Sequence, residues 1–338
     1  MKISVIGSGS YGTAIASVFA TNITNNVTVF TRSVIQADDI GKRKQNRRYL
    51  DNLVLSSNLQ ASLDLTAIVR SDFVFLALPS SSIKAFVDDN SDMLDSCSVI
   101  VNLAKGFISS ENITIPAYIE KRLARTLGIA SLKGPTFAAD MLLAPISAVS
   151  IAATDIVSLA QMRSLLDGVD IIYDVIDDIT VLEYLSILKN IYAIAIGIIE
   201  ARFNNPNLRA ALVTQSAVEM QRVVSLCVGA NVDLLKYAGI GDLLLTGLND
   251  QSRNRTLGLM IGKGFISPDT YDKAVVVEGL RAISFVSANV SRGELANCPI
   301  LANLKSLIDL EISTSDFIAK TLHRFSRGRD AERQLMAR

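Results

Sequence analysis

A single lysine, Lys189, interrupts a run of apolar residues at helical spacing that includes Ile187, Leu188 and Ile191. Such a lysine could extend its ammonium group to water. If it is partly buried instead, its pKa shifts towards neutrality, the range in which a general acid or base works well. His323 is the one histidine in the chain, so a histidine-based metal site or a Ser-His-Asp triad is nearly excluded. Proton transfer therefore falls to other residue types, and Lys189 is the first candidate.

Further segments mix glycine with polar residues at the boundary of apolar runs, and they could complete a site around this lysine. One reaction that such residues could serve is reduction of a carbonyl, which needs a hydride at carbon, a proton at oxygen and positive charge near the developing alkoxide. Lys189 could supply the proton and Lys105 a second positive charge, while Asp242 could orient Lys189 and keep it charged. The candidate catalytic residues are therefore Lys189, Lys105, Asp242 and Asn190.

The run Ser252-Arg253-Asn254-Arg255 is suited to holding a phosphate group. A guanidinium fork matches the oxygens of a tetrahedral anion in a bidentate manner. The substrate would then be a small phosphorylated ketone or alcohol. The same run could instead form a polar loop or the start of a helix.

A GxGxxG turn, Gly7-Ser8-Gly9-Ser10-Tyr11-Gly12, stands directly after an apolar strand and before a helix-forming segment. The glycines Gly7, Gly9 and Gly12 permit a tight turn, close approach of the backbone to a pyrophosphate, and close packing of helix on strand. The N–H groups at the start of the helix would face the anion. This placement predicts that the chain binds a dinucleotide.

The residues after the second strand indicate which dinucleotide is preferred. An acidic residue at this place would hold the ribose 2′-hydroxyl of NAD, but the chain has Thr31-Arg32-Ser33. The Arg32 guanidinium can pair with a 2′-phosphate, so we expect NADP(H) to be preferred and NAD(H) to be tolerated. Arg32 could also be an exposed arginine at a strand end.

Short apolar runs separated by longer segments must position these residues in the first half of the chain. The runs 3–6, 27–30, 73–78 and 98–102 suit parallel strands buried on both faces, which predicts a doubly wound α/β domain. From residue 179 the chain has long apolar-periodic helical segments, such as 187–201 and 209–226. We therefore predict a dinucleotide-binding domain at 1–177 and a helical substrate and dimerisation domain at 178–338.

Composition narrows the function classes. Lys+Arg and Asp+Glu both number 33, so no long-range attraction draws the protein to nucleic acid or anionic membranes. The three cysteines are far apart, which favours reduced thiols rather than disulfides or a zinc site, and no metal site is expected. Glycines break the uncharged stretch 3–31, and the stretch 141–154 is too short to cross a bilayer. We expect a cytoplasmic protein with no integral membrane association.

The residues taken together resemble the bacterial type of the NAD(P)-dependent glycerol-3-phosphate dehydrogenase family. The matching segments cover essentially the whole chain, in the family's order. They are the turn at 7–14, Asn46-Arg47-Arg48-Tyr49-Leu50, Pro79-Ser80, Lys105-Gly106, Gly134-Pro135-Thr136-Phe137-Ala138, Leu188-Lys189-Asn190, Gly239-Ile240-Gly241-Asp242-Leu243 with Thr246, the run at 252–255, and Val277-Glu278-Gly279.

This resemblance implies an N-terminal Rossmann domain and an all-helical C-terminal domain like that of 6-phosphogluconate dehydrogenase. It implies a homodimer that interconverts dihydroxyacetone phosphate and sn-glycerol 3-phosphate for glycerophospholipid synthesis. Lys189 would be the proton donor or acceptor. The implied substrate contacts are Lys105, Gly134, Thr136, Asp242, Thr246, Ser252, Arg253 and Asn254, and the implied cofactor contacts are Ser10, Tyr11, Arg32, Lys105, Ala138, Arg253, Val276 and Glu278.

Two alternatives stay open at this point. The chain departs from the family pattern at residues 184–187 and at Gln215-Ser216. A dehydrogenase of the same architecture could therefore act on another phosphorylated polyol or on a hydroxy acid. A non-catalytic dinucleotide-binding regulator could also keep the fold, although such a protein would not need a proton donor beside a nicotinamide.

Overall fold

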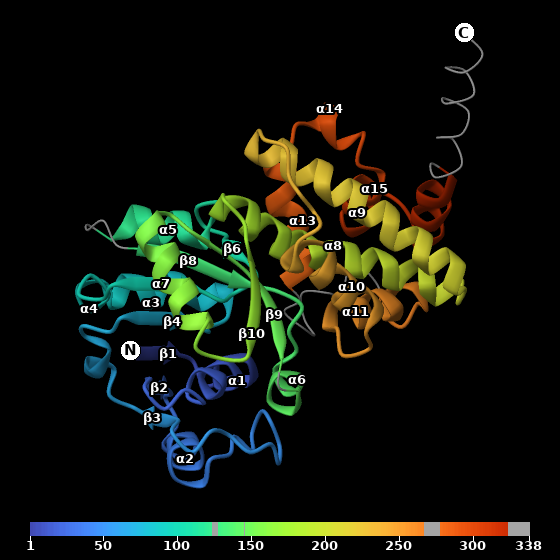
Figure 1. The fold of residues 1–338 in the computed structure, drawn as a ribbon. Helices are drawn as coiled ribbons and strands as arrows, with labels where there is room; N and C mark the ends of the chain where they lie inside the picture. Colours follow the sequence, from blue (N-terminus) through green and yellow to red (C-terminus); the bar gives the residue numbers. More distant parts are fainter. Residues whose placement is uncertain (124–127, 145, 267–277, 324–338) are drawn as a thin grey trace. The chain divides into compact units, whose positions relative to one another are not determined.

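The computed structural model describes residues 1–123, 128–144, 146–266 and 278–323 (Figure 1). The chain divides into two compact units. The first consists of residues 1–186 with 236–238, and the second consists of residues 187–235 with those from 239 onward. The sequence-based boundary between residues 177 and 178 stays a prediction.

The first unit is built on one eight-stranded sheet, in which six neighbouring strands run parallel in the order β3-β2-β1-β4-β5-β8. This order is that of a doubly wound dinucleotide-binding sheet. The predicted fold class is therefore confirmed. The six strands are β1 (Lys2–Ile6), β2 (Asn26–Phe30), β3 (Gln60–Ser62), β4 (Phe73–Leu76), β5 (Val99–Asn102) and β8 (Gly128–Lys133).

Two further strands extend this sheet beyond β8 in the opposite direction. β9 (Ser147–Ala153) pairs antiparallel with β8, and β10 (Ile171–Val175) pairs parallel with β9. A small antiparallel hairpin, β6 (Phe107–Ile108) with β7 (Ile113–Thr114), lies outside the sheet. The sequence patterns did not indicate this reversal of direction.

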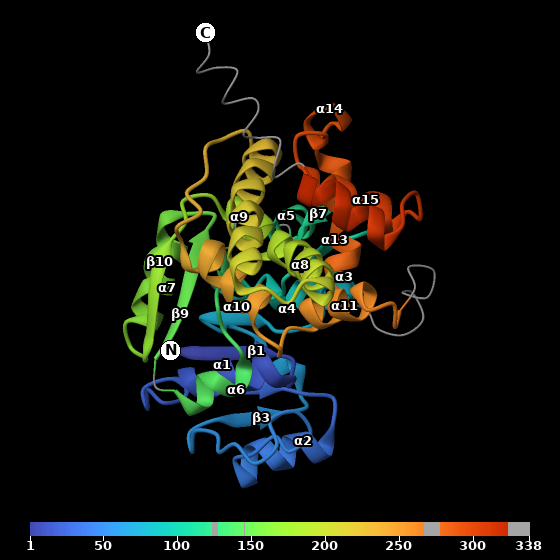
Figure 2. The ribbon, with the colours of Figure 1, turned by 90° about the vertical axis from the view of Figure 1, so that its right-hand side faces the viewer.

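Helices cover both faces of the sheet because the side chains of each central strand alternate between two apolar cores. Phe73 and Phe75 of β4 belong to a core that includes residues of α1 and α7, whereas Val74 and Leu76 belong to a core that includes residues of α3 and α5. Figures 1 and 2 both show α6 beside α1, against which it packs. The helical segments of this unit are α1 (Ser10–Phe19), α2 (Val34–Asp38), η1 (Asp39–Arg43), η2 (Leu65–Ile68), α3 (Ser80–Asp89), α4 (Ser91–Leu94), α5 (Ile115–Arg122), α6 (Ala138–Leu143) and α7 (Ile156–Leu166).

The second unit is helical, as the periodicity predicted. Most of its long central helix α8 belongs to it, while the first residues of α8 belong to the first unit. Its helices include α8 (Ile179–Arg202), α9 (Pro206–Val228), α10 (Asp242–Leu248), α11 (Arg253–Gly262), α13 (Glu278–Asn289), α14 (Arg292–Leu295) and α15 (Pro299–Ile308), and a wide turn, η3 (Tyr237–Gly241), precedes α10.

Two glycines allow α8 and α11 to approach backbone to backbone. A Cβ atom on Gly258 would lie 2.1 Å from the carbonyl oxygen of Ile194, and one on Gly197 would lie 2.3 Å from the carbonyl oxygen of Arg255. Neither position has room for a side chain. This close approach fixes the start of α11 against the helix that carries Lys189.

Among the described residues, α8 alone is long and apolar enough to cross a membrane. Its apolar window is entirely buried inside the fold. The central helix of a folded domain has the same properties, so this helix gives only weak support for a membrane span.

A buried carboxylate joins α9 to the start of α15. The carboxylate oxygens of Glu219 accept hydrogen bonds from the backbone N–H groups of Ile300 at 2.9 Å and Leu301 at 2.7 Å. Glu219 therefore satisfies N–H groups at a helix N-terminus, where negative charge is favoured. Burial raises the pKa of Glu219 from its usual 4.5 to about 7, although these two hydrogen bonds oppose the change.

This raised pKa predicts that stability falls as the pH increases. Between the unfolded pKa of 4.5 and the folded pKa of about 7, the folded state binds more protons than the unfolded state. Raising the pH from about 5 to about 8 should therefore lower the free energy of unfolding of the wild type by roughly 2 to 3 kcal/mol relative to that of Glu219→Gln. Urea unfolding at both pH values measures the difference.

The exposed Glu120 of α5 provides the matched control. Glu120→Gln should keep the pH dependence of the wild type. If Glu219→Gln and the wild type respond to pH in parallel, the buried carboxylate does not titrate as described.

Candidate active site

The glycine-rich turn begins where β1 ends, at Gly7, whose φ of +112° lies in the left-handed region that favours glycine. A Cβ atom on Gly12 would lie 2.1 Å from the carbonyl oxygen of Gly7, so the fold itself requires this glycine. A Cβ atom on Gly9 would meet no protein atom within 4 Å. The space in front of Gly9 is open, which is what close approach of a pyrophosphate to the backbone requires.

The start of α1 adds to this cradle. Gly9 is the N-cap residue and makes no side-chain cap bond to the first turn of the helix, which begins at Ser10. The N–H groups at a helix start attract phosphate groups. The residues of the turn therefore fit a bound dinucleotide.

A buried polar network holds this turn in shape. The carbonyl oxygen of Ser8 accepts hydrogen bonds from Nδ2 of Asn46 at 2.9 Å and from Nε2 of Gln36 at 3.4 Å. Nδ2 of Asn46 also donates to Oγ1 of Thr13 in α1 at 2.8 Å. Sequence reasoning named Asn46 only as part of the family resemblance and missed Gln36, because the burial of Gln36 depends on contacts with Ser8 and Asn46, which are distant in sequence.

Arg32 follows the carboxyl end of β2, and its side chain is exposed. Its neighbours are tied to the fold: Oγ1 of Thr31 donates to Oε1 of Gln36, and Ser33 caps α2 by accepting from the N–H of Gln36. The backbone around Arg32 is thus fixed next to the glycine-rich turn, while the guanidinium extends from it.

A chain of hydrogen bonds links four of the predicted residues in the first unit. Nζ of Lys105 donates to the carbonyl oxygen of Gly134 at 3.0 Å. Oγ1 of Thr136 lies 3.4 Å from the same carbonyl and donates to the hydroxyl of Tyr11 at 3.2 Å. The loop after β5, the loop after β8 and the glycine-rich turn are therefore connected. Ala138 begins α6, and Oγ of Ser10 donates to the carbonyl of Tyr49 at 3.3 Å.

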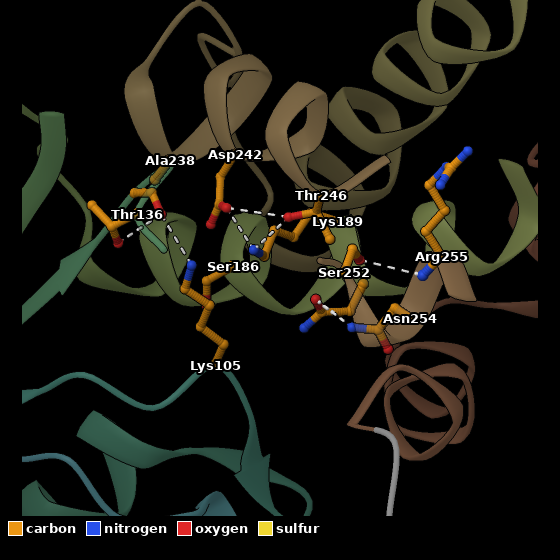
Figure 3. A network of polar contacts seen from close by, with 12 residues as sticks. Lys105, Thr136, Ser186, Lys189, Ala238, Asp242, Thr246, Ser252, Asn254 and Arg255 are labelled. Carbon is orange, nitrogen blue, oxygen red and sulfur yellow. Dashed lines mark hydrogen bonds and ion pairs between the residues drawn. The ribbon is translucent and has the colours of Figure 1, made fainter. Parts of the chain in front are cut away.

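The second unit holds Lys189 in a buried polar cluster, shown in Figure 3. Nζ of Lys189 lies 2.5 Å from Oδ1 of Asp242 and 2.8 Å from Oγ1 of Thr246. The exposed fractions are 5% for Lys189, 1% for Asp242 and 5% for Thr246. The ammonium therefore does not extend to bulk water, and the adjacent carboxylate stabilises its charged form.

The spacing of Asp242 and Thr246 along α10 explains why both side chains reach Nζ of Lys189. Asp242 is the first residue of α10, and Thr246 stands four positions later on the same helix face. Oγ1 of Thr246 also lies 3.3 Å from Oδ1 of Asp242. A carboxylate in the first turn is favoured by the helix dipole, so α10 supports the ionised form of Asp242.

A second polar contact ties α8 to α11 one residue after Lys189. Nδ2 of Asn254 donates to Oδ1 of Asn190 at 2.9 Å, and Oδ1 of Asn254 accepts from the N–H of Gly279 at 3.3 Å. Glu278, the residue before Gly279, is the first residue of α13. Val276, a predicted cofactor contact, lies outside the described residues.

The Ser-Arg-Asn-Arg run divides into separate roles. Oγ of Ser252 caps α11 by accepting from the N–H of Arg255, and the Arg253 side chain is exposed. Arg255 is buried and paired with Glu200, with Nη2 to Oε2 at 2.8 Å. Burial alone would lower the pKa of Arg255, but hydrogen bonds with Glu200 and Asp250 raise it above the usual value. Arg255 is therefore part of the structure, whereas the side chain of Arg253 is exposed.

A doubly wound sheet with this glycine-rich turn defines the class of dinucleotide-binding oxidoreductases. Family models of the NAD-dependent glycerol-3-phosphate dehydrogenase N-terminus and C-terminus match residues 2–158 and 178–319. The chain belongs to this family, which confirms the resemblance found in the sequence.

Individual relatives agree with the family match. The chain is 32% identical to glycerol-3-phosphate dehydrogenase [NAD(P)+] of Methanothermobacter thermautotrophicus, over 84% of this chain and 86% of the relative. It is 30% identical to the enzyme of the same name from Rhizobium etli, over 96% of this chain and 98% of the relative. The crystal structure of glycerol-3-phosphate dehydrogenase from Coxiella burnetii superposes with a TM-score of 0.79 at 26% identity, covering 95% of this chain and 98% of that one.

Proposed function

We propose that this protein interconverts dihydroxyacetone phosphate and sn-glycerol 3-phosphate with a nicotinamide dinucleotide as hydride carrier. The observation that carries the proposal is the buried cluster of Lys189, Asp242 and Thr246 in a chain of this family. A buried ammonium with one carboxylate partner is suited to exchange a proton with a substrate oxygen. The relatives named glycerol-3-phosphate dehydrogenase [NAD(P)+] support the substrate and the cofactor class.

When bound, the reduced nicotinamide supplies the hydride. Lys189 donates the proton to the oxygen that becomes the alcohol, and accepts it in the reverse direction. Asp242 and Thr246 hold Nζ of Lys189 in place before and after transfer. The ammonium of Lys105 adds positive charge near the developing alkoxide, and Asn190 holds Asn254 in place for the substrate.

The phosphate of the substrate would be held by the start of α11. The exposed Arg253 supplies the guanidinium, and Asn254 adds an amide next to it. Gly134, Thr136, Thr246 and Ser252 complete the proposed substrate contacts, although the Ser252 hydroxyl also caps α11.

The dinucleotide would lie against the glycine-rich turn. Its proposed contacts in this chain are Gly7, Gly9, Ser10, Tyr11, Gly12, Arg32, Lys105, Ala138, Arg253, Val276 and Glu278. The guanidinium of Arg32 is exposed, and the segment Thr31-Arg32-Ser33 has no carboxylate. Both features support preference for NADP(H) with NAD(H) tolerated. We further propose a cytoplasmic homodimer whose product feeds glycerophospholipid synthesis.

The direct test is oxidation of NADPH, followed at 340 nm, with dihydroxyacetone phosphate and with unphosphorylated dihydroxyacetone. We expect turnover with the phosphorylated ketone and a much lower kcat/KM with the other. Turnover with another phosphorylated or acidic carbonyl compound alone would contradict the substrate. If none of these carbonyl compounds is turned over, the result favours a non-catalytic dinucleotide-binding protein.

Lys189 and Arg253 should affect different kinetic parameters. Lys189→Ala removes the proton donor and should lower kcat by about 100-fold or more, with little effect on the Kd for NADPH. Arg253→Ala removes a binding group and should mainly raise KM for dihydroxyacetone phosphate. Steady-state kinetics and NADPH fluorescence titration measure these quantities.

The exposed Lys263 on the same unit is the matched control for the lysine variant, and Lys263→Ala should leave kcat unchanged. An equal loss of NADPH binding and of turnover in Lys189→Ala would overturn the role assigned to this lysine.

Arg32→Asp should reverse the cofactor preference. The new carboxylate would repel the 2′-phosphate of NADPH and accept from the ribose hydroxyl of NADH. The ratio of kcat/KM with NADPH to kcat/KM with NADH should therefore fall by about 10-fold or more, equivalent to ~1.4 kcal/mol. Arg70→Asp makes the same charge change at another exposed arginine of the first unit and should leave the ratio as it is. An unchanged ratio in Arg32→Asp would remove this residue from cofactor recognition.

A further inference from the structure

An ion pair is completely buried in the first unit, between two residues that are not among the predicted site residues. Nζ of Lys133, the last residue of β8, lies 3.1 Å from Oε1 of Glu183 in α8. Both side chains have an exposed fraction of 0%. A lysine and a glutamate are rarely found fully buried unless they are paired.

The pair is joined to the loop that leaves β5. Nζ of Lys133 donates to the carbonyl oxygen of Asn102 at 3.3 Å and to that of Ala104. Nδ2 of Asn102 donates to both carboxylate oxygens of Glu183 at 3.0 Å, and its Oδ1 accepts from the N–H of Ala104 at 3.0 Å. Oγ of Ser131 completes the cluster by donating to Glu183 at 2.6 Å.

The hydrogen bonds of Lys133 reach Ala104, the residue before Lys105, and Lys105 makes a similar bond in the opposite direction. The ammonium of Lys133 binds the carbonyl of Ala104, next to Lys105, while the ammonium of Lys105 binds the carbonyl of Gly134, next to Lys133. Two lysines therefore cross-link the loop after β5 and the loop after β8. The direction of the Lys105 side chain depends on both links.

Stability alone does not account for this arrangement. Removing two charges from water costs about as much as their attraction returns, and well-packed apolar side chains often serve at least as well. What the charges add is a set of directed hydrogen bonds to backbone carbonyls where the chain leaves the sheet. The ion pair of Lys133 and Glu183 therefore fixes the backbone of the residues that directly precede Lys105.

We propose that Lys133 and Glu183 are positioning residues for Lys105, holding the loop 102–105 so that the Lys105 ammonium meets the substrate in one orientation. Neither residue touches the substrate. The inference rests on the proposed function for its kinetic test, because Lys105 is there assigned to the reacting oxygen.

The test uses the full chain with the paired variant Lys133→Met/Glu183→Gln. A single change would leave one buried charge without its partner, whereas the paired variant removes both charges and keeps an acceptor for Asn102 and Ser131. We expect this variant to unfold cooperatively near the wild-type temperature and to lose about 10- to 100-fold in kcat/KM for dihydroxyacetone phosphate. The control Lys305→Met/Asp309→Asn removes an exposed pair of the second unit and should keep wild-type kinetics.

The same paired change in a Lys105→Ala background separates positioning from a merely structural role. If the pair acts through Lys105, its removal there should lower kcat/KM by less than about threefold further. An equal loss in both backgrounds, or wild-type kcat/KM in the paired variant, would overturn the proposal.

A readout without substrate distinguishes this inference from the proposed function. Amide hydrogen exchange of residues 102–106 should be faster in the paired variant than in the wild type and in the control. Should the wild type fail to reduce dihydroxyacetone phosphate, the proposed function falls, and exchange still decides whether Lys133 and Glu183 hold the loop 102–105. Unchanged exchange in this loop would exclude that role.

Discussion

The second unit depends on one constraint: the ammonium of Lys189 is buried, so protein groups must take the place of water around it. An ammonium buried without partners would be strongly unfavourable, so the fold must bring acceptors to Lys189. A carboxylate at the first position of α10 and a hydroxyl one turn later meet this need together. The glycine contact of α8 with α11 then places Asn254 against Asn190. Asp242 and Thr246 thus satisfy the Lys189 ammonium, and the Asn190–Asn254 contact lies one residue further along α8.

The first unit obeys a different constraint, which comes from the direction of its strands. β1, β2, β5 and β8 all run parallel, so their carboxyl ends lie at one edge of the sheet. The glycine-rich turn, Arg32, Lys105 and Gly134 each follow one of these ends. Short connections at this edge then allow the hydrogen bonds that join Lys105, Gly134, Thr136 and Tyr11. Topology brings together residues that are far apart in the sequence.

The strands that could be predicted were those in which apolar and β-branched residues predominate, namely β1, β2, β4 and β5. β8 ends in Ser131-Leu132-Lys133, and its polar side chains are buried only because Glu183 and Asn102 lie beside them. β3 is three residues long and gives no periodic signal. Lys189 and Asp242 were predictable because a lysine within an apolar helix needs a partner. Gln36, Lys133 and Glu183 were not, since their burial depends on contacts distant in sequence.

Gly9, the middle glycine of the turn, is not required by the fold in the way that Gly7 and Gly12 are. Gly7 and Gly12 are demanded by the backbone, whereas Gly9 has an ordinary conformation with open space before it. The fold of the first unit therefore has room for a side chain at residue 9, but that side chain would occupy the space that close approach of a pyrophosphate requires.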